Sequence, residues 1–265
     1  DESESRGLGD VYKRQPWGAV GAWGAVGGAM YLRRNAIATL VNSTIDVASA
    51  TSSSGYVEGG AIFIQTNASA TLTNAIIANA SAKSTSSTAL GGAIALARNA
   101  VAMLIGSTIV NTSVGSNIET AMGGAMSLFP NASATLINST VVCASARSIM
   151  ANAAGGALFL FPNASAVLLY TTLTMVSATS DSGSVQGGAM QLSNNAKATL
   201  TASTIANASA KSDLGTVSGG AMSLFTNAVA TLIYSTIVNA SAFSNSGNVY
   251  GGAMELVAVS YTHLR

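Results

Sequence analysis

The tetrad Gly-Gly-Ala followed by Met, Ile or Leu recurs eight times along the chain, and every interval between tetrads is 32 residues. The copies begin at Gly27, Gly59, Gly91, Gly123, Gly155, Gly187, Gly219 and Gly251. A fixed period in the range of about 20–50 residues indicates a stacked repeat architecture, in which each unit buries its apolar face against its neighbours. This spacing constrains the fold strongly and the function much less.

Within one repeat, short stretches of alternating apolar and polar residues predict β-strands. Met126–Leu128 and Ala132–Leu136 both alternate, and a further short strand is expected around Ser203–Ile205. Alternation with a period of two residues is typical of a half-buried strand. Asn, Gly and Ser fall between these stretches, where turns favour residues that tolerate a left-handed backbone or bond to it.

Two other repeat folds have similar periods. A helical repeat is disfavoured because Thr, Ser, Asn, Val, Ile and Gly are poor helix formers and Glu and Lys are scarce. A leucine-rich horseshoe needs a denser leucine spacing than this chain has. We therefore predict an all-β fold, a right-handed parallel β-helix (β-solenoid) with one coil per 32-residue repeat. Near the Ser-x-Ser-Gly-x-Val stretch we expect a protruding loop.

Stacking identical coils turns each repeat position into a column along the axis, with about 4.8 Å between neighbours. One column consists of Asn35, Asn67, Asn99, Asn131, Asn163, Asn195 and Asn227. Asn side chains stacked in this way can hydrogen-bond amide to amide. We expect the serine columns from Ser49 to Ser241 and from Ser52 to Ser244 to bond between coils as well.

Both ends of the chain differ from the repeats. Ser5–Gln15 and Val259–Arg265 match translations of the two opposite strands of one oligonucleotide, which resembles the adaptor of transposase-based sequencing libraries. We therefore interpret residues 1–15 and 259–265 as non-native scars; a natural charged arm and tail is the alternative. Residues 16–26 are then an irregular lead-in or a partial coil. Residues 27–258 are seven complete repeats and a partial eighth.

The composition argues against several classes of partner. Only 8% of the residues are charged, against about 25% in an average globular protein. Nucleic acid is not an expected partner because no basic surface can form from so few cations. No apolar run reaches the roughly 18 residues of a membrane-spanning helix. The single cysteine, Cys143, forms no disulfide framework and stands where other repeats have Asn, so we interpret it as a substituted corner residue.

One family resemblance spans residues 27–258. The GGA-[Met/Ile/Leu] tetrad, the Asn-Ser-Thr-Ile segment and the closing Asn-Ala-Ser-Ala resemble the repeats of polymorphic outer-membrane proteins, which have paired GGA[ILV] and FxxN motifs. The first motif is intact at Gly59–Ile62, whereas the second takes the form Ile-x-Asn, as in Ile109–Asn111 and Ile237–Asn239. The resemblance implies a β-helical passenger of a surface or secreted adhesin.

The charged residues offer one weak catalytic candidate. Asp181 and Asp213 occupy the same repeat position in neighbouring coils and could form a carboxylate pair or a calcium site. Lys83, Arg147 and Lys211 share a position close by. All five fall in the expected loop, where a charge is usually only solvated. Glu58 and Glu119 form no cluster in the sequence. We assign no catalytic, cofactor-binding or metal-binding residue, and no cofactor.

Three repeated features have simple structural explanations. Nine Asn-x-Ser/Thr sequons would be glycosylation acceptors in a secreted eukaryotic protein, although the repeat itself spells them. They lie at Asn42, Asn67, Asn79, Asn111, Asn131, Asn138, Asn163, Asn207 and Asn239. A Thr column that could order water is interrupted by Met103 and Val167, and Phe129, Phe161 and Phe225 could stack on sugars or pack beneath a loop.

We therefore expect a non-enzymatic fragment of an extracellular or cell-surface β-helix protein, acting as a stalk or an adhesin-like surface. Its expected partners are carbohydrates or ligands on host or other cell surfaces. The alternative is part of a carbohydrate-active β-helix enzyme, a polysaccharide lyase or hydrolase, whose active coil lies outside the fragment. Uncapped coils expose strand edges and an apolar core, so we also expect end-to-end self-association.

Overall fold

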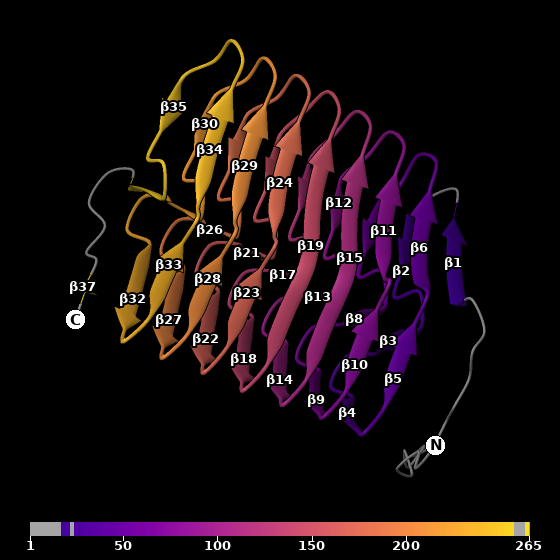
Figure 1. The fold of residues 1–265 in the computed structure, drawn as a ribbon. Helices are drawn as coiled ribbons and strands as arrows, with labels where there is room; N and C mark the ends of the chain where they lie inside the picture. The colour runs from indigo at the N-terminus through magenta and orange to yellow at the C-terminus, as the bar shows by residue number, and fades with distance from the viewer. Residues whose placement is uncertain (1–16, 22–23, 257–262, 265) are drawn as a thin grey trace, which may run out of the picture.

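The computed structural model describes residues 17–21, 24–256 and 263–264, which form strands and turns with no helix. Each coil contributes strands to four parallel sheets, which we number first to fourth in the order in which a coil visits them after its Gly-Gly-Ala tetrad. In Figure 1 the chain advances from right to left while the near strands run upward and the return strands lie behind them, so the coil is right-handed. The predicted parallel β-helix is confirmed.

The first and second sheets form two walls of the main core. The first sheet contains β3 (Met30–Leu32), β8 (Ile62–Ile64), β13 (Ile94–Leu96), β17 (Met126–Leu128), β21 (Leu158–Leu160), β26 (Met190–Leu192), β31 (Met222–Leu224) and β36 (Met254–Leu256). The second contains β4 (Ile37–Val41), β9 (Ser69–Thr73), β14 (Val101–Ile105), β18 (Ser133–Ile137), β22 (Ser165–Leu169), β27 (Lys197–Thr201), β32 (Val229–Ile233) and β37 (His263–Leu264).

The third sheet is the largest, and its upper part faces the fourth. The third contains β1 (Trp17–Gly21), β5 (Thr44–Asp46), β6 (Ala48–Ser52), β10 (Ile76–Ala78), β11 (Ser81–Ser84), β15 (Thr108–Ser116), β19 (Thr140–Ser148), β23 (Thr172–Thr174), β24 (Ser177–Ser180), β28 (Thr204–Ala206), β29 (Ser209–Ser212), β33 (Thr236–Val238) and β34 (Ser241–Ser244). The fourth contains β2 (Gly24–Val26), β7 (Tyr56–Glu58), β12 (Ala89–Leu90), β16 (Ala121–Met122), β20 (Ala153–Ala154), β25 (Val185–Gln186), β30 (Val217–Ser218) and β35 (Val249–Tyr250).

The pairing register follows the sequence period through the repeats. Thr135 lies opposite Met103 on one side and Val167 on the other, each 32 residues away. The lead-in joins this pattern as a partial coil, because β1 pairs with β6 and β2 pairs with β7. At the other end, β37 extends the second sheet beside β32. The predicted scar at residues 1–15 and most of the one at 259–265 lie outside the described residues.

Each coil turns at four corners where the backbone is left-handed, with φ between 47° and 70°. Gly opens every tetrad with this conformation, and Asn holds the next corner in all seven complete repeats. The predicted turn chemistry is therefore confirmed, because these two residue types reach this region at little cost. The third and fourth corners also accept Val47, Tyr170 and Met175, each at a cost of about 1–2 kcal/mol. Cys143 has a φ of 54° at a corner held elsewhere by Asn, as predicted.

Hydrogen bonds between coils use the polar columns in two ways. The predicted amide-to-amide bond joins Asn99 Nδ2 to Asn67 Oδ1 at 3.2 Å. In the column from Ser52 to Ser244, each hydroxyl bonds to main chain instead of to another serine. Ser148 Oγ donates to the Glu119 carbonyl of the preceding coil at 2.8 Å and accepts the Ala151 N–H at 3.0 Å. These buried hydroxyls thus close the turn within one coil and tie it to the coil before.

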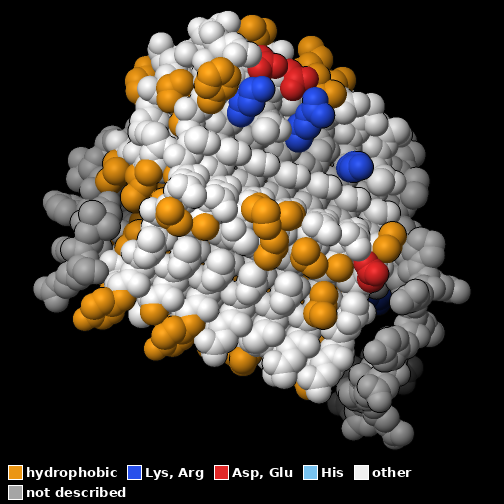
Figure 2. Space-filling model, viewed as in Figure 1, with side chains coloured by type: hydrophobic (Ala, Val, Ile, Leu, Met, Phe, Trp, Pro, Cys, Tyr) orange, Lys and Arg blue, Asp and Glu red, His pale blue; other side chains and the backbone are white. Residues whose placement is uncertain are grey.

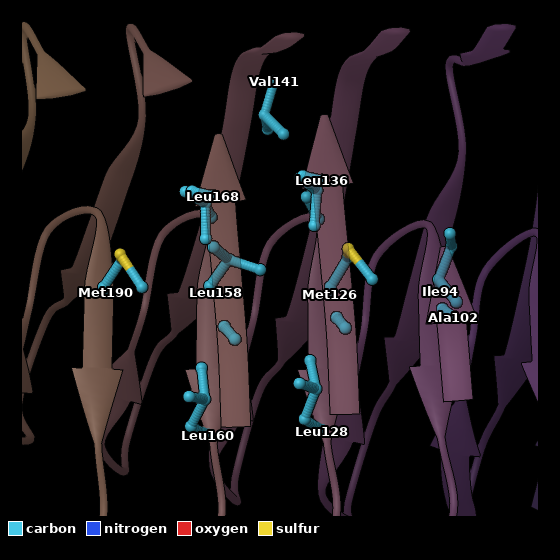
Figure 3. Close-up of a cluster of buried hydrophobic side chains, with 14 of the residues drawn as sticks. Ile94, Ala102, Met126, Leu128, Leu136, Val141, Leu158, Leu160, Leu168 and Met190 are labelled. Atoms are coloured by element: carbon cyan, nitrogen blue, oxygen red, sulfur yellow. The ribbon is translucent and has the colours of Figure 1, made fainter. Parts of the chain in front are cut away.

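Leu, Ile, Met and Ala side chains from three walls fill the interior. Figure 3 shows Met126, Leu128 and Leu136 pointing into one coil, and Leu158 and Leu168 repeating the arrangement in the next. All five are fully buried. The core is therefore a set of stacked layers, and each layer is completed by the coils on either side.

The first-sheet strands are more buried than their alternation predicts. In β17 the middle residue, Ser127, is as inaccessible as its two apolar neighbours. The reason is that the first and fourth sheets meet at a crease, where Ser127 Oγ donates to the Met122 carbonyl of the same coil at 2.7 Å. Both faces of this strand are covered, so an alternating pattern does not imply a half-exposed strand here.

The expected protruding loop is a packed lobe instead. The upper third-sheet strands and the fourth sheet lie face to face, and small residues such as Ala82, Ala89 and Ala146 form a second apolar cluster between them. A similar cluster in later coils includes Val185 and Val217. Ala and Val are small enough for the two sheets to approach closely, so the chain needs only a short turn at the lobe's tip (Figure 1).

Two glycines of different surroundings test how closely the coils stack. A Cβ on Gly124 would overlap the Gly156 carbonyl oxygen of the next coil and lie 2.6 Å from Ser145 backbone atoms. A Cβ on Gly115 would lie 3.8 Å from its nearest neighbour, the Arg147 carbonyl oxygen. We expect Gly124→Ala to lower the free energy of unfolding by about 3 kcal/mol or more, because backbone must shift. Gly115→Ala should leave it unchanged or raise it by up to about 1 kcal/mol.

Urea unfolding followed by circular dichroism measures both variants. Equal stability of Gly124→Ala and the unmodified chain would contradict the stacking described above.

Candidate binding hollow on the third sheet

The outward face of the lobe has one column of variable side chains running across the coils. The residues of this column, paired strand to strand, are Thr51, Lys83, Gly115, Arg147, Thr179, Lys211 and Phe243. Gly115 is the one member of this column without a side chain. Because strands in a sheet lie about 4.8 Å apart, the backbones of Lys83 and Arg147 stand about 10 Å apart on either side of it.

This gap opens into a shallow hollow of about 560 Å³. Ser113, Gly115 and Ser145 lie along its floor, and Lys83 and Arg147 flank it. The Cγ atom of Lys83 lies 4.0 Å from the place where a Gly115 Cβ would stand, so the Lys83 side chain forms one wall. The hollow therefore combines hydroxyl groups with two cations.

Charges on this face alternate along the lobe. Arg147 Nη2 lies 3.4 Å from Asp181 Oδ2, and Lys211 Nζ lies 3.8 Å from Asp213 Oδ1. Both pairs are exposed, so each contributes at most about 1 kcal/mol. Among the described residues, Lys83 has no carboxylate within salt-bridge distance. Figure 2 shows the basic side chains in a row across the upper part of this face, with acidic side chains beside them.

The charged residues that the sequence placed in a loop have different positions. Lys83, Arg147 and Lys211 lie on third-sheet strands, because the expected loop is a strand there. Asp181 and Asp213 lie side by side where the strands end, as their shared repeat position predicted. Each carboxylate has its own cation partner, and Asp213 Oδ1 also accepts a hydrogen bond from Asn245 Nδ2 at 2.8 Å.

The remaining sequence candidates lie elsewhere. Phe129 and Phe161 stack with centroids 4.9 Å apart, and Phe159 meets Phe161 edge to face at the crease of the first and fourth sheets. The aromatics therefore pack mainly on each other. The Thr column lies on the second sheet and is interrupted in register by Met103 and Val167, as predicted.

Glu58 is the carboxylate with an altered environment. It belongs to β7 of the fourth sheet, opposite Val26 and Leu90, and burial raises the pKa of its carboxyl group above the ordinary value. The exposed Glu119 lies at a turn of the lobe, so these two carboxylates are not brought together as a site. Periodicity gave no indication that Glu58 was buried, because no other repeat has a charged residue at this position.

The described residues contain no group of three or more His, Cys, Asp or Glu side chains arranged to hold a metal ion. They also contain no helix long and apolar enough to cross a membrane. Comparisons of the chain with protein families, with curated proteins and with solved structures give no match.

The hollow itself was not predicted from the sequence. Its one signal was the Gly at position 115, in a column where other coils have Thr, Lys, Arg or Phe. That signal becomes informative only when the segment is known to be a strand, because a glycine in a loop implies no missing side chain between two neighbours.

Burial of Glu58 has a consequence for stability as a function of pH. A raised pKa means that the folded chain binds this proton more tightly than the unfolded chain. The penalty is absent below the unfolded pKa of about 4.3 and complete above the raised folded pKa, so this group lowers stability as pH rises. We expect Glu58→Gln to stabilise the protein more at about pH 7 than at about pH 4.

Urea unfolding at the two pH values measures this difference. Glu119→Gln is the matched control, and its effect should stay within about 0.5 kcal/mol at both. A stabilisation by Glu58→Gln that is equal at both pH values would show that burial of this carboxylate does not influence folding.

Proposed function

We propose that this chain is part of an extracellular or cell-surface β-helix protein that acts as a stalk and presents an adhesive surface, without catalysing a reaction. The observation that carries the proposal is the uniform stacking of the coils, in which inward and corner positions repeat while outward positions on the lobe vary. A scaffold of this kind extends through space and displays different side chains along its length.

The sequence resemblance to polymorphic outer-membrane protein repeats supports a surface location. The tetrads that carry this resemblance occupy equivalent left-handed corners from Gly27 to Gly251. The lobe supports the adhesive role, because its charged and hydroxyl-bearing column lies on strands that a rigid core holds in place. Rigid elements position contacts at a lower entropy cost than loops do.

A binding assay with a parallel turnover assay tests the function. The full chain is immobilised and exposed to a panel of neutral and acidic polysaccharides, and the same mixtures are assayed for new reducing ends and for unsaturated products. We expect saturable binding to at least one polysaccharide without accumulation of products. Product accumulation proportional to protein concentration would favour the lyase or hydrolase alternative. Absence of binding to the whole panel would remove the adhesive part of the proposal.

End-to-end association belongs to the same proposal. Apolar side chains are exposed in the outermost described coils, including Ile37 in the first and Val249 and Leu256 in the last. Among the described residues, β36 has a paired neighbour on one side only, β31, so its other edge can pair with a further strand. We expect the chain to form oligomers at micromolar concentration in sedimentation velocity. A single monomeric species over a tenfold concentration range would contradict this.

A further inference from the structure

We propose that the hollow over Gly115 is a binding site for an acidic polysaccharide, with a carboxylate or sulfate group of the polysaccharide held between Lys83 and Arg147. This inference rests on the proposed adhesive function and specifies its ligand class and its site. It concerns the third-sheet face of the lobe, where the sequence pattern alone indicated only solvated charges.

The two flanking cations give the hollow its preference for an anion. Lys83 is exposed and has no carboxylate partner among the described residues, so its charge is available to a ligand. Arg147 contacts Asp181 through Nη2 at 3.4 Å, and its side chain remains 62% exposed, which leaves other donors of the guanidinium free. Asp181 and Glu119 are the nearby negative groups, and neither lines the hollow.

The floor and the rim suit a sugar better than a small ion. Ser113 and Ser145 offer hydroxyl groups on the floor, and Thr85 and Asn117 add polar groups at the edge. Ile149 supplies an apolar surface on the same rim, and its side chain is 38% exposed. A pyranose ring has both hydroxyl groups and apolar C–H faces, so this mixture of contacts matches it. Hydroxyl donors and acceptors in a shallow site bind such groups directly or through water.

The absence of a side chain at Gly115 makes the hollow, and it is not required by the backbone. Gly115 lies in the middle of β15, and its φ is not left-handed. A Cβ there would have ordinary van der Waals room. Thr occupies the same column at Thr51 and Thr179, so Gly115→Thr fills the hollow with a residue that this sheet already accepts.

Three variants separate the hollow from general charge. Gly115→Thr fills the site without changing any charge, and Lys83→Thr removes one flanking cation. Lys211→Thr is the matched control, because Lys211 belongs to the same column and carries the same charge but lies outside the hollow. Each variant is compared with the unmodified chain for binding to heparin, polygalacturonate and neutral dextran by biolayer interferometry, after circular dichroism has verified that it is folded.

We expect the unmodified chain to bind heparin or polygalacturonate and not dextran. Lys83→Thr should weaken this binding about two- to fivefold, as loss of one exposed ion pair does. Gly115→Thr should weaken it at least as much, and Lys211→Thr should leave it unchanged. Binding should be nearly lost at about 1 M salt, where the Debye length is about 3 Å. A response to heparin alone would identify the held group as a sulfate, and a response to polygalacturonate would identify it as a carboxylate.

Several outcomes would overturn the inference. Equal losses for Lys83→Thr and Lys211→Thr, with no effect of Gly115→Thr, would show attraction to charge in general. Competition by duplex DNA as strong as that by the polysaccharide would show the same. Binding to dextran but to neither acidic polymer would overturn this site while the adhesive function stands. Absence of binding to all three, with every variant folded, would reject the site, and the wider panel would then decide the proposed function.

Discussion

Parallel pairing of each coil with the next at a constant separation of 32 residues is the constraint on which the rest of the structure depends. It aligns equivalent side chains into columns, so one repeat position has the same surroundings in every interior coil. A residue that suits the core, a corner or a serine ladder in one coil therefore suits it in all. This explains why the sequence repeats most closely at inward and corner positions, and varies on the outer face of the lobe.

Much of the fold follows from the sequence because these columns are visible in it. The tetrads and the Asn column mark corners, and the alternating stretches mark strands such as Ala134 and Leu136, which are buried as expected. Two features did not follow. Ser127 is buried because a second sheet covers the outer face of its strand, and the lobe packs on Ala and Val between short turns. Both depend on how sheets fold against one another, which a periodic pattern along one strand does not record.

The candidate site illustrates the same limit. The cations of the lobe were visible in the sequence, but placing them in a loop removed their geometry. Once Lys83 and Arg147 are on neighbouring strands on either side of Gly115, their separation is set by strand spacing, and the missing side chain becomes a hollow. Glu58 was overlooked for a related reason, because it is a single departure in a column otherwise free of charge, and its burial depends on the crease between two sheets.

The second glycine of the tetrad also has a consequence for length. In the interior coils the space beside it is occupied by the carbonyl of the equivalent glycine one coil further along, as at Gly124 and Gly156. Gly252, in the last described tetrad, has no atom within 4 Å of the same place. The requirement for glycine therefore comes from the coil that follows and not from the coil that contains it. One methyl group at this position is tolerated only where nothing stacks beyond, so a single codon can set where such a solenoid stops growing.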